Sequence, residues 1–178
     1  KGIEPRSRTR LVFTGDLDYG PEPRLQLHWL SEVLSIRLRE ELREALGGTY
    51  GVRVSASPSR LPREEYSFSI AFGSAPERAD SLLAAVWREI ERLQAEGAQE
   101  KDLAKVREAD IRSDETNRKR NAWWVAQLTH LDQTGEAPLL LQPVQERVRQ
   151  LTPELIRAAA RTYLRKDRYV RVTLLPER

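Results

Sequence analysis

A Gly-Gly pair at positions 47 and 48 constrains this fold most, because it separates a helical pattern from a strand pattern. Glycine takes the left-handed conformation that ends a helix without a steric penalty. The following residues alternate between two classes, as in a strand with one apolar face, and the apolar ones are Tyr50, Val52, Val54 and Ala56. The pattern therefore predicts that Arg43, before the turn, and Tyr50, after it, lie at one end of a sheet.

Hydrophobic periodicity divides the rest of the chain into further strands and helices. Alternation predicts strands over 10–14, from 50, over 66–72 and over 169–175. Apolar residues at helical spacing predict helices over about 23–46, from 74 to 97, about 100–134, 144–151 and 154–164. This order, β-α-β-β-α-α-α-α-β, predicts an α+β domain in which helices pack on one face of a mostly antiparallel sheet.

Some of these elements carry signals at their ends or along one face. Ser74-Ala75-Pro76-Glu77 fits a capping box, and Thr152 precedes Pro153 as a second helix start. The strands from 50 and over 66–72 are expected to form an antiparallel hairpin. The 100–134 helix is polar in its middle, which favours one long helix solvated there, with a break near 117–121 as the alternative. The first helix carries charged residues opposite its leucine stripe, namely Arg37, Arg39, Glu40, Glu41 and Glu44.

Composition limits the class of protein. The 178 residues fit one domain, 1–178, which is expected to bury roughly 70% of its unfolded surface. Cysteine is absent, which excludes disulfides and thiolate metal sites. The net charge of +3, from 30 basic and 27 acidic residues, does not demand a nucleic-acid partner. No apolar run approaches the roughly 18 residues of a membrane span. Methionine is also absent, so we expect a domain excised from a longer chain.

The segment around Arg43 and Tyr50 resembles the arginine/tyrosine motif of the insulinase/pitrilysin (M16) family of zinc peptidases. The resemblance is to the C-terminal, non-zinc domain, particularly that of bacterial PqqL-like members. It extends to the flanking segments 33–40, 55–60 and 68–73, and it covers nearly the whole chain. The resemblance implies an M16 peptidase-like (LuxS/MPP-like) fold, with a sheet lining a chamber and helices outside. It also implies a bacterial periplasmic or cell-envelope location.

In that family a His-x-x-Glu-His helix in another domain holds the zinc, and this sequence has no such motif. The resemblance thus implies that zinc lies in a complementary N-terminal half, on the same polypeptide or a separate subunit, and that this chain is not active alone. It implies that Tyr50 gives a hydrogen bond to substrate and transition state, that Arg43 binds substrate, and that neither binds metal. The substrate would be a peptide or unfolded polypeptide.

Arg43 and Tyr50 also have ordinary structural interpretations. Arg43 could pair with Glu40 or with the negative end of its helix, effects of ~0.3–1 kcal/mol. Tyr50 is in phase with Val52 and could belong to the core. The alternative function is a non-catalytic scaffold or interaction domain, because the family includes members that have lost the zinc site. Presence of both side chains favours a working peptidase half.

Two histidines are the other candidate ligands. His28 and Glu32 are four residues apart on the first helix and could form half of a metal site, but two ligands do not hold zinc. We favour a packed or surface histidine. His130 has no second ligand at a useful spacing.

Trp123 and Trp124 follow a short basic run, Arg118-Lys119-Arg120. Aromatic residues beside cations can bind single-stranded nucleic acid. Acidic residues precede this run, however, namely Asp110, Asp114 and Glu115. We therefore expect the tryptophans to pack against another layer or to support contact with a neighbouring domain, and we expect no nucleic-acid partner.

Overall fold

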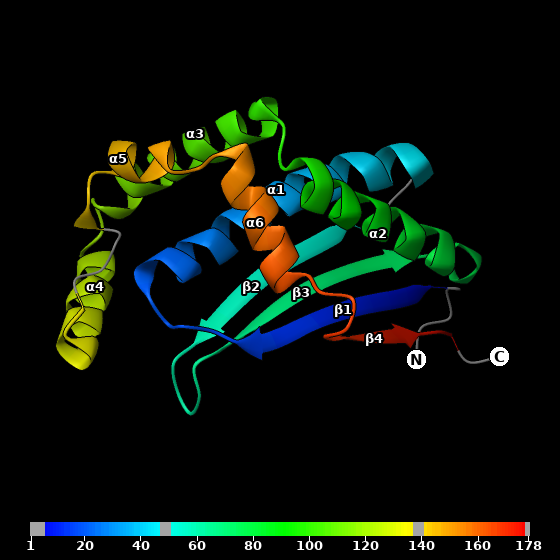
Figure 1. Cartoon of the computed structure of the whole chain (residues 1–178), viewed down its shortest axis with the longest axis horizontal. Coiled ribbons are helices and arrows are strands. Elements are labelled where there is room, and N and C mark those ends of the chain that lie inside the picture. Colours follow the sequence, from blue (N-terminus) through cyan, green and yellow to red (C-terminus); the bar gives the residue numbers. More distant parts are fainter. Residues whose placement is uncertain (1–5, 47–50, 137–140, 177–178) are drawn as a thin grey trace.

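The computed structural model describes residues 6–46, 51–136 and 141–176, with the backbone alone at 43–46. A four-stranded antiparallel sheet is covered on one face by helices (Figure 1). Its strands, in the spatial order β2-β3-β1-β4, are β1 (Ser7–Asp16), β2 (Val52–Ser59), β3 (Glu65–Ser74) and β4 (Tyr169–Leu174). The α+β architecture expected from the sequence is confirmed.

The helices follow the predicted order with one more α-helix and a short 3-10 turn. They are α1 (Pro21–Leu46), a short 3-10 turn η1 (Pro76–Arg78), α2 (Ala79–Glu96), α3 (Glu100–Asn117), α4 (Asn121–Thr134), α5 (Val144–Arg149) and α6 (Pro153–Tyr163). The additional helix arises because the polar stretch near 118–120 does break the predicted 100–134 helix. The predicted hairpin of β2 and β3 is also confirmed, with Val52 opposite Phe72 and Ser59 opposite Glu65.

The core lies between the sheet and the three helices α1, α2 and α6. Alternate residues of β1 and β3, such as Leu11, Phe13, Phe68 and Ile70, are fully buried. They meet the leucine stripe of α1 and the apolar faces of α2 and α6, whose fully buried members include Leu30, Leu34, Leu38, Val86, Ile90, Ile156 and Ala160. Burial of this one set of faces is the main stabilising term, since each large side chain contributes roughly 1.5–3 kcal/mol.

The predicted capping box at Ser74 is wrong. Ser74 is the last residue of β3, and its hydroxyl lies 2.8 Å from that of Ser7 on β1. Ala75 precedes η1 instead, without a side-chain cap, and α2 begins only at Ala79. Ser74 therefore pairs with β1 in the sheet, although the local sequence pattern assigned it to the start of the helix. The second predicted cap is confirmed, because the Thr152 hydroxyl accepts a hydrogen bond from the Leu155 amide at 3.2 Å.

Helix α4 differs from the other long helices because none of its residues is buried. It stands away from the sheet, at the end of the molecule where α3 and α5 also lie (Figure 1). Trp123 and Trp124 meet edge to face at 4.8 Å and lie beside the Arg118 guanidinium. The Trp124 indole donates to the Arg118 carbonyl. The tryptophans thus pack against the α3–α4 break, and the expected contact with a neighbouring domain stays a prediction.

Candidate functional site

The two residues singled out by sequence flank the junction of α1 and β2. Tyr50 lies outside the described residues, and only the backbone of Arg43 is described, in the last turn of α1. Their predicted roles stay predictions. The described residues directly after Tyr50 are Gly51 and Val52, and both line a hollow at the start of β2. Arg8 and Arg53 line the same hollow.

This hollow belongs to the sheet face opposite the helices. Along each strand, alternate residues point into the core, and the residues between them point to the opposite face, where they are accessible. On β1 the accessible residues include Arg8 and Arg10, and on β2 they include Arg53. Small side chains lie between them on β3, namely Ser69, Ala71 and Gly73. At this end the open sheet face therefore carries arginines separated by small side chains, and it is basic.

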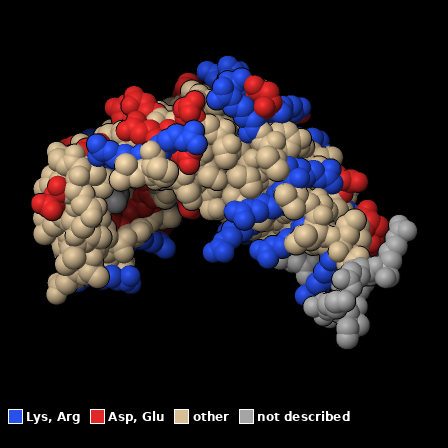
Figure 2. All heavy atoms as spheres, turned by 90° about the horizontal axis from the view of Figure 1, so that it is seen from below, with Lys and Arg blue, Asp and Glu red and all other residues tan. Residues whose placement is uncertain are grey.

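The pairing register fixes how these arginines lie. Arg10 is opposite Ala71, which is opposite Arg53, so the two arginines share one row across three strands. Arg8 lies two residues before Arg10 on the same strand and opposite Gly73. A second hollow, of about 630 Å³, is lined by all three arginines together with Ser55, Ser69, Ala71, Val172 and Leu174. Figure 2 shows Lys and Arg side chains projecting into the hollowed lower side of the molecule.

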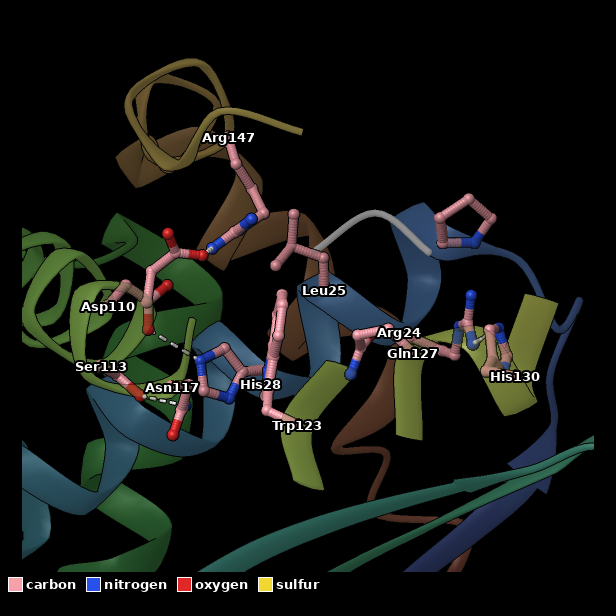
Figure 3. Close-up of a pocket in the computed structure, with 12 residues that line it drawn as sticks. Arg24, Leu25, His28, Asp110, Ser113, Asn117, Trp123, Gln127, His130 and Arg147 are labelled. Carbon is pink, nitrogen blue, oxygen red and sulfur yellow. Dashed lines mark hydrogen bonds and ion pairs between the residues drawn. The ribbon is translucent and has the colours of Figure 1, made fainter. Parts of the chain in front are cut away.

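A different pocket, of about 500 Å³, lies where α1, α3, α4 and α5 meet (Figure 3). The His28 ring points toward Asp110, with Nε2 3.0 Å from Oδ1. The second Asp110 oxygen accepts from the Trp29 indole at 2.8 Å. Arg24 reaches His130 at 3.3 Å and Glu136 at 3.1 Å. These polar contacts tie α1 to α3 and to the end of α4.

The His28–Asp110 contact favours the charged form of each side chain. Burial favours the neutral imidazole, but the hydrogen bond and charge of Asp110 outweigh it and raise the pKa of His28 above its usual value. Burial likewise opposes ionisation of Asp110, yet the bonds from His28 and Trp29 lower the pKa of that carboxyl. Glu32, the predicted partner of His28, makes only a longer-range contribution.

This pocket lacks the arrangement of a hydrolytic triad. Ser113 lines it, but its hydroxyl accepts a bond from the Asn117 amide at 3.1 Å. Across the described ranges, no three His, Cys, Asp or Glu residues are grouped as metal ligands. The paired side chains are best explained as contacts that hold the arm of α3 and α4 against α1.

The sequence matches the peptidase M16 inactive domain over residues 4–109. The chain belongs to this family. The match covers more than half of the chain and includes β1, α1, β2, β3 and α2, which are three of the four strands and two of the helices that cover them. This confirms the family that the sequence resembles, and it identifies the domain as the one named inactive.

Solved structures share the fold of this M16 domain. The periplasmic protease PqqL from Escherichia coli has a TM-score of 0.78 at 23% identity, over 99% of this chain and 20% of that chain. The ferredoxin protease FusC, solved in complex with Arabidopsis ferredoxin, gives 0.79 and 21%, with the same coverage. A peptidase M16 inactive domain from Pseudomonas fluorescens gives 0.78 and 23%, over 96% and 41%. No curated protein matches the sequence.

This M16 domain thus spans about a fifth of the length of the PqqL and FusC chains. In the described part of the chain, no helix is long and apolar enough to cross a membrane.

Sequence reasoning missed two features of this M16 domain. Arg37, on the charged face of α1, is buried, and its Nε lies 3.0 Å from Glu89 on α2. Asp102 on α3 is 3.7 Å away and fully buried. The charge pattern of one helix cannot reveal which helices will cover it. The open-face arginines were detectable, because Arg8 and Arg10 alternate with Thr9 and Leu11 in β1.

Proposed function

We propose that this chain is the non-zinc domain of an M16 zinc endopeptidase, in which it encloses a polypeptide substrate and supplies Tyr50 and Arg43 to it. The family match carries the proposal. Zinc and the glutamate base would belong to a complementary M16 half, on the same polypeptide or on a partner chain. The open sheet face supports the proposal, because it offers an accessible surface that begins at Gly51, directly after Tyr50.

The residue types suit peptide hydrolysis. Attack of water on a peptide carbonyl produces an oxyanion, and a phenol donor beside it stabilises the transition state. An arginine fork can hold a substrate carbonyl or carboxylate by two hydrogen bonds. Bound zinc would polarise the carbonyl and activate the water. The task of this chain is then to bind, to orient and to donate one hydrogen bond.

The solved relatives support a polypeptide substrate. FusC is described as a ferredoxin protease and was solved with ferredoxin bound, and PqqL is described as a periplasmic protease. Both chains are about five times as long as the part that this chain covers, which leaves room for further domains. By analogy, the substrate of the assembled enzyme here is a peptide or an unfolded protein segment.

The deciding experiment measures zinc-dependent hydrolysis of a quenched fluorescent peptide by the assembled enzyme. Tyr50→Phe should lower kcat/KM by about a hundredfold, as expected for loss of one oxyanion donor. Arg43→Ala should also lower it, mainly through KM. Tyr169→Phe and Arg39→Ala are matched controls, since Tyr169 lies on β4 and Arg39 is an exposed residue one turn earlier on α1. Both controls should retain wild-type rates.

A scaffold or interaction domain is the competing function. Wild-type rates for both Tyr50→Phe and Arg43→Ala would remove these side chains from the mechanism and favour that account. Circular dichroism of each variant would show that lost activity does not reflect lost folding.

A further inference from the structure

The arginines of the open sheet face lack counter-charges within the domain. In the described ranges no carboxylate lies within ion-pair distance of Arg8, Arg10 or Arg53, whereas Arg37, Arg118, Arg147 and Arg165, among others, are ion-paired. Arg10 makes one bond, from Nε to the Ser69 hydroxyl at 2.8 Å. Its terminal nitrogens have no described partner in the protein. Three exposed guanidinium groups thus keep their hydrogen-bonding capacity for something outside the domain.

The same face changes character along the strands. Toward the other end of β1, Thr14 pairs with Ser67, and Asp16 pairs with Glu65. The face is therefore basic where β2 begins, with Val172 and Leu174 of β4 beside the arginines. Its middle mixes polar residues with Val12 and Val170, and its far end is acidic. Such a gradient orients an extended ligand, because only one direction places negative groups at the arginines.

The spacing of the arginines fits an extended polypeptide. Residues two apart on a strand are separated by roughly 6.6–6.8 Å, which is also the separation of side chains at i and i+2 in an extended peptide. Arg8 and Arg10 therefore match two carboxylates on one side of a bound segment. Arg53 lies two strand spacings, roughly 9.5 Å, from Arg10. This separation is about one Debye length, so Arg53 adds a third positive charge whose attraction for the bound carboxylates is partly screened by salt.

We propose that this surface binds an acidic segment of the polypeptide substrate, with side-chain carboxylates at alternate positions paired to Arg8 and Arg10 and drawn in by Arg53. The proposal rests on the function proposed above and names the substrate class. The hollow is lined between the arginines by the small side chains of Ser55, Ser69 and Ala71, so the segment can approach the guanidinium groups closely. Single-stranded nucleic acid is less suited, because none of the described residues that line this hollow is aromatic and could stack on bases.

Binding to the chain itself tests this proposal without any need for catalysis. Three fluorescein-labelled peptides would differ only at two positions, i and i+2, which are glutamate, glutamine or lysine. Anisotropy should show the glutamate peptide binding best, with affinity that falls as salt rises. One exposed ion pair changes affinity by up to about fivefold, so Arg8→Ser with Arg10→Ser should weaken binding by about tenfold. Arg53→Ser should cause a smaller loss.

The matched control is Arg39→Ser, an exposed arginine on α1. It lowers the net charge equally but should leave the affinity unchanged. Equal binding of the glutamate and glutamine peptides, or an equal loss in Arg39→Ser, would overturn the proposal. Tighter binding of a single-stranded oligonucleotide of the same charge, lost in Arg8→Ser with Arg10→Ser, would overturn it in favour of a phosphate-binding surface.

Hydrolysis by the assembled enzyme separates this proposal from the function on which it rests. The ratio of kcat/KM for the glutamate and glutamine peptides should fall toward one in Arg8→Ser with Arg10→Ser, while Tyr50→Phe should lower both rates and keep the ratio. Loss of activity in Tyr50→Phe without charge preference would contradict the acidic-segment proposal alone. Selective binding with wild-type hydrolysis by Tyr50→Phe would contradict the proposed catalytic role alone.

Discussion

The two faces of the sheet are built from the same strands but use their residues differently. On the covered face, apolar side chains are fully buried, and the buried Arg37 of α1 meets three carboxylates, those of Glu40, Glu89 and Asp102. On the open face, Arg8, Arg10 and Arg53 are exposed and have no described carboxylate partner. Stability should therefore depend on the first face and ligand binding on the second.

Phe68→Ala gives the largest expected effect on stability. Phe68 is fully buried at the centre of β3, so truncation loses its burial and leaves a cavity, at a cost of about 3–5 kcal/mol. Its neighbour Ser67 points to the other face, and Ser67→Ala should change the free energy of unfolding by less than about 0.5 kcal/mol. Urea unfolding of the two variants compares the faces at adjacent positions. Similar losses of unfolding free energy in both variants would contradict the expectation that stability depends on the covered face.

Arg37→Met should cost about 3 kcal/mol. The variant removes the guanidinium from a buried cluster and leaves Glu89 and Asp102 with fewer counter-charges. The loss lies at the low end of the usual range because Arg92 stays 2.8 Å from Glu89 and Lys105 stays 3.9 Å from Asp102.

The matched substitution on the open face is Arg10→Met, which should leave the free energy of unfolding within about 0.5 kcal/mol of wild type. Denaturation of both variants in one buffer makes the comparison direct. Destabilisation by Arg10→Met as great as that by Arg37→Met would assign the open-face arginines to stability rather than to binding.

The covered side and the arm also differ in how closely they pack. Gly97, after α2, has φ of 80° and ψ of −167°, and an added Cβ would lie 2.4 Å from the Pro153 carbonyl oxygen. Gly97→Ala should thus cost about 2 kcal/mol or more, from backbone strain and the clash together. Gly135, after α4, also has positive φ, but an added Cβ there would meet none of the described atoms within 4 Å, so Gly135→Ala should cost about 1 kcal/mol. Thermal unfolding would rank them, and the reverse order would contradict the packing difference.

Sequence patterns predicted this fold well where one element determines its own structure. The α1 stripe and the β2–β3 alternation depend only on the local spacing of apolar residues. The polar stretch near 117–121 raised a helix break only as an alternative to one long helix, and the structure has the break. Burial of Arg37 could not be predicted because its partners come from α2 and α3. Ser74 was misassigned because its partner, Ser7, is 67 residues away. The roles of Arg43 and Tyr50 came from family resemblance, and they stay predictions.

The smallest expected effect concerns the half-exposed pair of His28 and Asp110. This pair tests whether a charge pair outside the core stabilises the folded protein. The His28 side chain is 46% exposed, so the pair should contribute at most about 1 kcal/mol. The His28 pKa is raised from its ordinary 6.5, so its contribution is fully present below pH 6.5 and is lost as pH rises through the higher folded value. The Asp110 pKa is lowered from 3.8, so its contribution is present above pH 3.8 and is lost as pH falls through the lower folded value.

The two windows overlap between about pH 4 and 6.5, where Asp110→Asn should destabilise most relative to wild type. As the pH rises through the raised pKa of His28, the imidazole loses its charge, and the loss that remains at high pH reports the bond from the Trp29 indole, which does not titrate. Urea unfolding at pH 5.5 and 8.5 measures both parts, and His28→Asn should lose the first while keeping the second. Glu32 and Arg147 add fields of opposite sign at His28 and are unchanged in either variant. An effect of Asp110→Asn that is equal at both pH values would show that Asp110 stabilises α1 through Trp29 alone, so that charge pairing at a half-exposed site adds nothing, in contrast to the buried Arg37.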